Sequence, residues 1–507
     1  MEESPQKIGI TQKILNYVER TGNKLPQPVT LFVILILIVL LASLIASWLD
    51  LSAVHPGTKE EIHAINLLNK EGIRRIFTDM VTVFTDFPPL GLVLVVMLGI
   101  GVAERSGLIA VSLKAFVSNV PSRLITFSIV TAGMLSSIAA DAGYVVLIPL
   151  GAAIFYGMGR HPIAGLAAAF AGVSGGFGAN LFLTGLDPLL AAFTTAAAQI
   201  LNPSYVVEAP SNWYLMAASV PVVGIAGTYV TEKILEPRLG RYQSLEGLEE
   251  ADNEISDIEK KGLKWAGISV LISLIVVGFM FIPEWGILRG DDGSFNPFFT
   301  SIVPLMLFLF FIPGLIYGRI TKVIKSDKEV ASMTAESMAS MGGYIVLAFA
   351  AAQFVAYFNW SNLGLILAIN GADGLKAIGF EGIPLIISFI IVSSVINLLI
   401  GSASAKWAIM APIFVPMLML MGYSPELTQA AYRIGDSYSN ILTPLLPYFP
   451  LVIVFAQKYV KNIGLGTIIS AMLPYAVVFA IVRIIMMILW MLFEVPLGPD
   501  APMYYIP

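Results

Sequence analysis

The chain has 507 residues, of which 57% are apolar and only 12% are charged, and its formal net charge is −5. Soluble domains are about one quarter charged, so this composition and a mean hydropathy of +0.82 predict an integral membrane protein. Apolar runs of about 20 residues favour spanning helices over barrel strands. The small net charge argues against nucleic acid as a partner, and the lack of cysteine excludes disulfides and cysteine-bound zinc.

The chain begins with a basic segment of amphipathic pattern. It covers residues 1–28, and we expect it to lie along the cytoplasmic surface of the membrane. The apolar run at 29–48 predicts the first span. A polar loop of mixed charge then reaches Asp86, and residues 88–103 form the second predicted span.

Two interrupted apolar segments follow. Residues 124–158 are broken by SSIAADAG, and each arm is too short to span at about 1.5 Å per residue, which predicts a re-entrant hairpin. Residues 162–200 are broken by GVSGGFGANLFLTGLDP, but they are long enough for a broken spanning helix. Together with the flanking spans, these segments make up a predicted first repeat over residues 29–230.

The second half has the same order of elements after a charged linker. Residues 231–264 are rich in basic and acidic side chains, which predicts a cytoplasmic loop. Residues 265–507 contain a second predicted hairpin at 383–422, broken at GSASAKW, and a second broken span at 426–459. The remaining predicted spans cover residues 213–230, 265–283, 299–318, 339–358 and 467–493.

The distribution of basic residues fixes the predicted topology. Nine crossings and two hairpins place every basic cluster and the N-terminus on the cytoplasmic side. The two hairpins then enter from opposite faces. We therefore predict an all-α polytopic protein of the bacterial inner membrane, with nine transmembrane helices, two opposed re-entrant hairpins, two broken helices and an inverted repeat.

The two halves also match in sequence. The segment that starts at Asp141 aligns without gaps with the one that starts at Ser404, and NLFLT from Asn180 resembles NILTP, which ends at Pro444. Chance similarity between apolar segments is the competing explanation, but the fixed spacing of turn residues favours duplication. Inverted repeats of this kind are typical of secondary transporters that bind near the membrane midplane. The aligned turn residues are Pro149 with Pro412, Gly159 with Gly422 and Pro162 with Pro425.

Charged residues at the predicted helix breaks are the main candidates for chemistry. Arg433 and Asp436 share one helical face, with Asn440 a turn further along. They form either a structural ion pair or a coupled ion or proton site. Asp187 lies at the other break, where it either relays protons or caps the following helix. Asp141, at the first hairpin tip, has the same two interpretations.

Other polar side chains lie around the second hairpin tip. Asn397 offers its amide oxygen either to sodium or to an interhelical hydrogen bond. Trp407 either stacks on an aromatic substrate or packs in the core, and Lys406 either pairs with an anion or extends toward the membrane surface. Ser404 is one of the small residues that let a ligand approach the backbone. No HExxH, GxSxG or GxxxxGK[ST] motif occurs, which argues against an enzyme or an ATP-driven pump.

The chain resembles the p-aminobenzoyl-glutamate transporter (AbgT) family over essentially its whole length. The resemblance rests on segments such as NYVERTGNKLPQPVTLF, GRHPIAGLAAAFAGVSGGFGANLFLTGLDPLL and INLLIGSASAKWAIMAPIFVPMLMLMGYSPELTQAAYRIGDS. INLLIGSASA and AGVSGGFGANLFL look closer to the family's antimetabolite-efflux branch. The resemblance implies a homodimer of nine-span protomers, each with two opposed hairpins. The family's functional residues match Asp187, Asn397, Trp407, Arg433, Asp436 and Pro444.

We therefore expect a cation-coupled secondary transporter of p-aminobenzoyl-glutamate, p-aminobenzoate and sulfonamide antimetabolites, with export as the expected direction. Asn397 and Asp436 are expected to bind sodium, and no organic cofactor is expected. The competing predictions are a sodium-coupled dicarboxylate or citrate carrier of the same fold and a channel-like pore. The sequence does not separate sodium from proton coupling. The residues expected to bind or transport the substrate are Asp187, Trp407, Arg433, Asp436, Pro444, Ser404 and Asn180.

Overall fold

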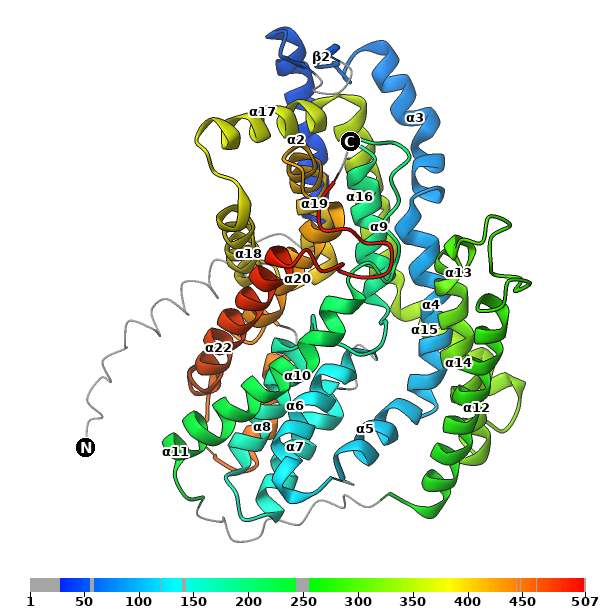
Figure 1. The fold of residues 1–507 in the computed structure, drawn as a ribbon, viewed down its shortest axis with the longest axis vertical. Coiled ribbons are helices and arrows are strands. Elements are labelled where there is room, and N and C mark those ends of the chain that lie inside the picture. The colour runs from blue at the N-terminus through cyan, green and yellow to red at the C-terminus, as the bar shows by residue number, and fades with distance from the viewer. Residues whose placement is uncertain are drawn as a thin grey trace.

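The computed structural model describes residues 28–54, 59–118, 120–138, 143–242, 255–443, 445–446, 448–461 and 463–505. The regular elements of this part of the chain are helices, together with one antiparallel ribbon formed by β1 (Ser52–Val54) and β2 (Glu61–His63). Figure 1 shows an elongated bundle, with α2, α17 and α19 toward one end and α5, α7 and α8 toward the other. Residues 1–27 of the predicted amphipathic segment, Asp141 and Pro444 lie outside the described residues.

The region between the first two predicted spans is largely helical. After α2 (Pro28–Trp48) and the ribbon, the chain forms α3 (Lys70–Thr85), and α4 (Pro88–Arg105) follows directly. Asn69 caps α3 because its side chain accepts a 2.7 Å hydrogen bond from the Gly72 amide. The prediction of a polar loop up to Asp86 was therefore wrong. The charged residues of α3 recur with helical period, and the helix packs on α16 (Gly342–Trp360).

The next elements contain the first predicted hairpin and the first predicted broken helix. α5 (Leu108–Ser118) leads into α6 (Ile125–Leu135), and a helix break separates α8 from α9. Residues 176–185 within that break carry several glycines, which disfavour helix. The remaining elements of this region are η1 (Ser122–Leu124), η2 (Ser136–Ile138), η3 (Gly143–Leu147), α7 (Ile148–Gly157), α8 (Pro162–Phe170), η4 (Ala171–Gly175) and α9 (Leu186–Ala198).

Helices also occupy both ends of the predicted linker at 231–264. η5 (Val230–Leu235) and α11 (Glu236–Leu239) extend α10 (Trp213–Tyr229), and α12 (Asp257–Phe281) begins at a capping box made by Ser256 and Glu259. The linker is thus shorter than predicted, because the capping box starts α12 before its apolar run. The next elements, in chain order, are α13 (Asn296–Thr300), α14 (Ile302–Ile320), α15 (Asp327–Ser340), α16 and α17 (Leu363–Ala377).

The last third of the chain contains the second predicted hairpin and the second predicted broken helix. α18 (Gly382–Leu399) and α19 (Ala403–Leu420) are separated by three residues, and α20 (Pro425–Ser439) follows. The chain leaves regular helix after α20 and resumes it at α21 (Phe449–Gln457). α22 (Leu465–Leu492) is the final helix.

The two halves join the segment predicted as a hairpin to the following broken helix in the same way. Gly159 and Gly422 each follow a helix end with a positive φ, +69° and +87°, and this left-handed backbone favours glycine. Three residues later, Pro162 and Pro425 each start the next helix at its first turn. The glycine and proline positions that align in sequence therefore perform the same structural task in both halves.

Nine helices of the described residues are long and apolar enough to cross a membrane. Two of them are α18 and α19, each of 18 residues, which corresponds to about 27 Å at 1.5 Å per residue. The others coincide with predicted spans. The predicted broken spans at 162–200 and 426–459 are absent from this set because their helical pieces are short or polar. The re-entrant hairpins stay a prediction.

The broken helices connect two separate hydrophobic clusters. One cluster contains residues of α9, α16, α19 and α20, and the other contains residues of α6, α7, α8, α21 and α22. Each broken helix therefore has one piece in each cluster, and α9 packs on α19 while α21 packs on α7 and α8. Both breaks therefore lie between the two clusters along the chain.

Candidate functional site

A buried ion pair joins the two broken helices. Asp187 lies in the first turn of α9, and Arg433 lies on α20 with its Nη1 2.6 Å from Asp187 Oδ1. The other oxygen, Oδ2, accepts hydrogen bonds from the backbone amide and the hydroxyl of Thr184, at 2.6 and 2.8 Å. Asp187 has no exposed surface. Its carboxylate therefore fixes the start of α9 and neutralises Arg433 at the same time.

A second buried ion pair connects α20 to α19. The Lys406 ammonium, from the first turn of α19, contacts the Asp436 carboxylate and also the amide oxygen of Asn397. The Asn397 amide nitrogen donates to the Asp436 carbonyl, to Ser439 Oγ and to Asn440 Oδ1, at 2.8, 2.7 and 2.9 Å. The two oxygens predicted to bind sodium thus face a lysine ammonium of the protein itself.

Trp407 lies in a layer of buried polar and aromatic groups. Its ring stacks on Tyr432 with centroids 4.5 Å apart, and its Nε1 donates a 2.9 Å hydrogen bond to Thr194 Oγ1. Thr194 also bonds to Gln429, whose amide nitrogen donates to Asn212 Oδ1 at 2.9 Å. Trp407 has no exposed surface. This layer ties α9 to α19 and α20 beside the charged residues.

The two remaining substrate candidates form hydrogen bonds within or next to the segments predicted as hairpins. The Asn180 amide nitrogen donates to the Met134 carbonyl and to Ser137 Oγ, at 3.2 and 2.9 Å, so the first break is attached to the end of α6. Ser404 Oγ lies 3.3 Å from Ser402 Oγ, the residue that caps α19. The hydrogen bonds of Asn180 and Ser404 do not reach the charged residues.

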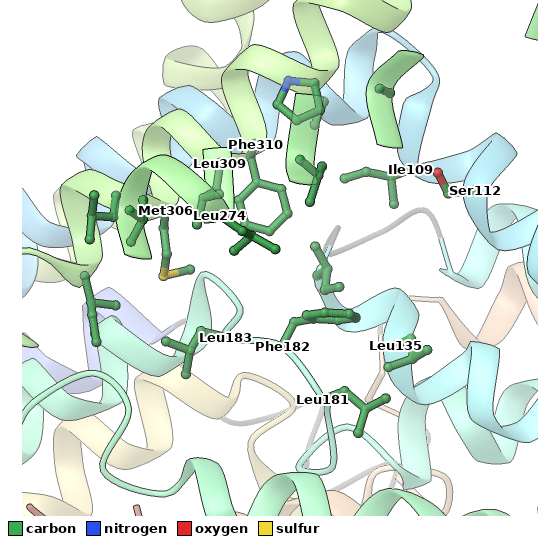
Figure 2. A pocket seen from close by; sticks show the side chains of 18 of the residues that line it. Ile109, Ser112, Leu135, Leu181, Phe182, Leu183, Leu274, Met306, Leu309 and Phe310 are labelled. Carbon is green, nitrogen blue, oxygen red and sulfur yellow. The ribbon is translucent and has the colours of Figure 1, made fainter. Parts of the chain in front are cut away.

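A cavity of about 770 Å³ lies to one side of the charged residues. Its walls come from α5, α12 and α14, and from the first break through Leu181, Phe182 and Leu183 (Figure 2). Almost all of the lining is apolar, and none of the charged residues described above contributes to it. The cavity can therefore hold an apolar or aromatic group. Leu181, Phe182 and Leu183 place the break of the first broken helix in its wall.

Sequence analysis overlooked one residue beside the site, Arg483. It lies in the middle of α22 and is 2% exposed. Its Nη2 donates a 2.9 Å hydrogen bond to the carbonyl of Gly178 in the first break. The signal was present in the sequence, because AIVRIIMM places an arginine inside a long apolar run and such residues mark functional sites by default.

The family can now be assigned from comparisons with known proteins. Residues 13–505 match the family described as "AbgT putative transporter family". The chain belongs to the AbgT transporter family. It is 39% identical to the p-aminobenzoyl-glutamate transport protein of Escherichia coli K12 over 490 residues, which cover 96% of each chain. The family consists of transporters, so this protein is a membrane transporter and not an enzyme.

Two solved structures of AbgT-family proteins share the fold. The YdaH transporter of Alcanivorax borkumensis matches with a TM-score of 0.89 and 44% identity, covering 94% of this chain and 100% of that one. MtrF of Neisseria gonorrhoeae, described with a class of antimetabolite efflux pumps, matches with a TM-score of 0.91 and 49% identity. That match covers 96% of this chain and 100% of MtrF.

Proposed function

We propose that this AbgT-family chain is a cation-coupled secondary transporter that exports p-aminobenzoate-related compounds, including p-aminobenzoyl-glutamate, p-aminobenzoate and sulfonamide antimetabolites. The substrate class follows the names of its relatives, one a p-aminobenzoyl-glutamate transport protein and one an antimetabolite efflux pump. The observation that carries the proposal is the Asp187–Arg433 pair, which joins the two broken helices. Buried charges at paired helix breaks suit a solute that carries charge itself.

In each internal ion pair, one side chain occupies the position that a ligand of the same charge would take. A substrate carboxylate competes with Asp187 for Arg433, and a cation competes with Lys406 for Asp436. An empty site therefore keeps these four charges paired, which lowers the cost of holding them in a low-dielectric interior. An anion at Arg433 displaces Asp187, and a cation at Asp436 displaces Lys406, so each ligand leaves one internal charge without its partner. The cost of these displaced charges would couple the two fluxes.

The identity of the cation depends on Lys406. Sodium at Asn397 and Asp436 has to displace the ammonium that contacts both oxygens. Protonation of Asp436 releases the same ammonium by removing its counter-charge. Sodium binding and protonation of Asp436 therefore act at the same site and release the same lysine.

Flux measurements in proteoliposomes test the proposal. Efflux of labelled p-aminobenzoate is measured with a sodium gradient or a pH gradient imposed separately. We expect saturable flux that one gradient accelerates, and strong loss of flux in Asp187→Asn. Flux that neither gradient alters contradicts cation coupling. Inhibition by succinate or citrate, without inhibition by p-aminobenzoyl-glutamate, would instead identify a dicarboxylate or citrate carrier.

The proposed setting is the bacterial inner membrane, with the N-terminus in the cytoplasm and two copies per transporter. It is supported by the nine apolar helices and by the family assignment. A reporter fused to the N-terminus should be protected from reagents applied outside intact cells. Crosslinking in membranes should give a dimer. Labelling of the reporter from outside, or a monomer under all conditions, contradicts these points.

A further inference from the structure

Within the part of the chain that the structure describes, Arg483 is a buried cation without an acidic partner. It is a residue of α22, which packs against η4, α10 and α20. Only Nη2 has a hydrogen-bond partner among these residues, the Gly178 carbonyl, whereas Nε and Nη1 have none. None of the ion pairs among the described residues includes Arg483.

The guanidinium lies where the first break meets α20. A Cβ atom added to Gly178 would be 3.0 Å from Arg483 Nη1, 2.3 Å from Ser437 Oγ and 3.1 Å from the Arg433 carbonyl. Arg483 therefore lies against the turn of α20 that follows Arg433. A side chain at position 178 would clash first with Ser437 Oγ and would also crowd this guanidinium.

The buried acids near the site are already engaged. Asp187 pairs with Arg433, and Asp436 pairs with Lys406. The third buried acid of the described residues is Glu426, at the start of α20. Its carboxylate accepts hydrogen bonds of 3.0 and 3.2 Å from the Tyr205 hydroxyl. Arg483 is thus the fifth charge of a cluster with two acids and three bases. An unpaired buried charge is strongly unfavourable, so a bound anion would balance the cluster.

We propose that Arg483 binds the carboxylate of aromatic monocarboxylates such as p-aminobenzoate, as a second guanidinium next to that of Arg433. This inference rests on the proposed function and names the group that recognises the anionic end. Arginine suits the task because its charged donors form strong hydrogen bonds with carboxylate oxygens. The Ser174 hydroxyl on η4, an element that packs against α22, is fully buried and also lacks a hydrogen-bond partner among the described residues.

Binding measurements with a charged and an uncharged ligand test this role. 4-Aminobenzoate and 4-aminobenzamide have nearly the same shape, but only the first carries a carboxylate. We expect the purified protein to bind 4-aminobenzoate about 10-fold to 100-fold more tightly than 4-aminobenzamide. This ratio corresponds to the usual strength of hydrogen bonds to a charged group. Arg483→Met should bring this ratio close to one. Arg483→Lys, which keeps the charge but loses the guanidinium fork, should give an intermediate ratio.

A matched arginine provides the control. Arg238 is exposed on α11 and also contacts α22, through Ser470, and Arg238→Met should leave the ratio unchanged. If Arg483 only braces Gly178, its variants will weaken both ligands equally, and an unchanged ratio overturns the proposal. If Arg483→Met does not fold, the ratio in Arg483→Lys decides by the same criterion. Wild-type protein that binds both ligands equally also overturns it, whereas protein that binds neither contradicts the proposed function instead.

Discussion

The two buried ion pairs differ in the parts of the molecule that they connect. Asp187 and Arg433 are 246 residues apart and come from different halves of the chain. Lys406 and Asp436 both come from the second half, on successive helices, and share Asn397 as a common neighbour. The first pair therefore holds the two halves together at their breaks. The second pair belongs to one half, so the proposed exchange of its lysine for another cation would not require the halves to separate.

The surroundings of the two pairs support this difference. Asp187 Oδ2 is also fixed by two bonds from Thr184, so the carboxylate is part of the turn that starts α9. The Asp436 carboxylate has its ion-pair partner at the end of a long, unbranched lysine side chain. A lysine carries a compact charge on a flexible stem and is easier to displace than a guanidinium held in a fixed geometry.

Loss of Arg433 should have the largest effect. Arg433→Met leaves the Asp187 carboxylate buried without a counter-charge, which should lower the free energy of unfolding by about 3–5 kcal/mol and abolish efflux. Thermal unfolding in detergent and proteoliposome efflux measure the two effects. The double variant Asp187→Asn with Arg433→Met should regain most of the stability but no transport. A double variant that transports normally contradicts the role given to this pair.

Loss of Lys406 should have a smaller effect that depends on the ions present. In Lys406→Met, sodium can take the position of the ammonium beside Asp436 and Asn397. A ligand present at about 100 times its Kd stabilises the folded state by about 2.7 kcal/mol. We therefore expect sodium chloride to raise the unfolding temperature of the variant above its value in choline chloride, with little change in wild type. Equal shifts in both proteins contradict displacement of the lysine.

Substitution of Trp407 should have a moderate effect on stability alone. Trp407→Phe removes the hydrogen bond to Thr194 but keeps an aromatic ring against Tyr432. The expected loss is about 1 kcal/mol in the free energy of unfolding. Trp265, which is 48% exposed, is the matched control, and Trp265→Phe should change stability much less. A large loss of p-aminobenzoate affinity without loss of stability would assign Trp407 to the substrate instead.

Loss of a surface ion pair should have the smallest effect, and it serves as the reference for the loss of the buried pairs. Arg105 Nη1 lies 2.6 Å from Glu336 Oε2, and both side chains are accessible to solvent. Glu336→Gln should change the free energy of unfolding by less than about 1 kcal/mol. Efflux should remain at the wild-type level. A loss as large as that of Arg433→Met would show that the difference between buried and exposed pairs has been overstated.

Much of the architecture could be predicted from the sequence because its signals are local. Apolar runs located most of the spans, and the recurring glycine and proline at 159 and 162 and at 422 and 425 gave the connection shared by both halves. The amphipathic helix α3 was not predicted, because a high density of mixed charge favours a solvated loop unless the helical period of the charges is considered. The predicted hairpins follow from basic residues and arm lengths, and they remain predictions for α6 with α7 and for α18 with α19.

In the candidate site, local sequence signals predicted the charged residues but not their ion-pair partners. Intramembrane charge identified Asp187, Arg433 and Asp436 as candidates, because a charge in an apolar segment is costly whatever its partner. Spacing suggested that Arg433 pairs with Asp436, since they lie three residues apart on one helix. The folded chain instead pairs Arg433 with Asp187 and Asp436 with Lys406. The sequence alone therefore determined which residues are charged and buried. Only the tertiary structure decided their partners, because ion pairing depends on which helix breaks meet across the two halves.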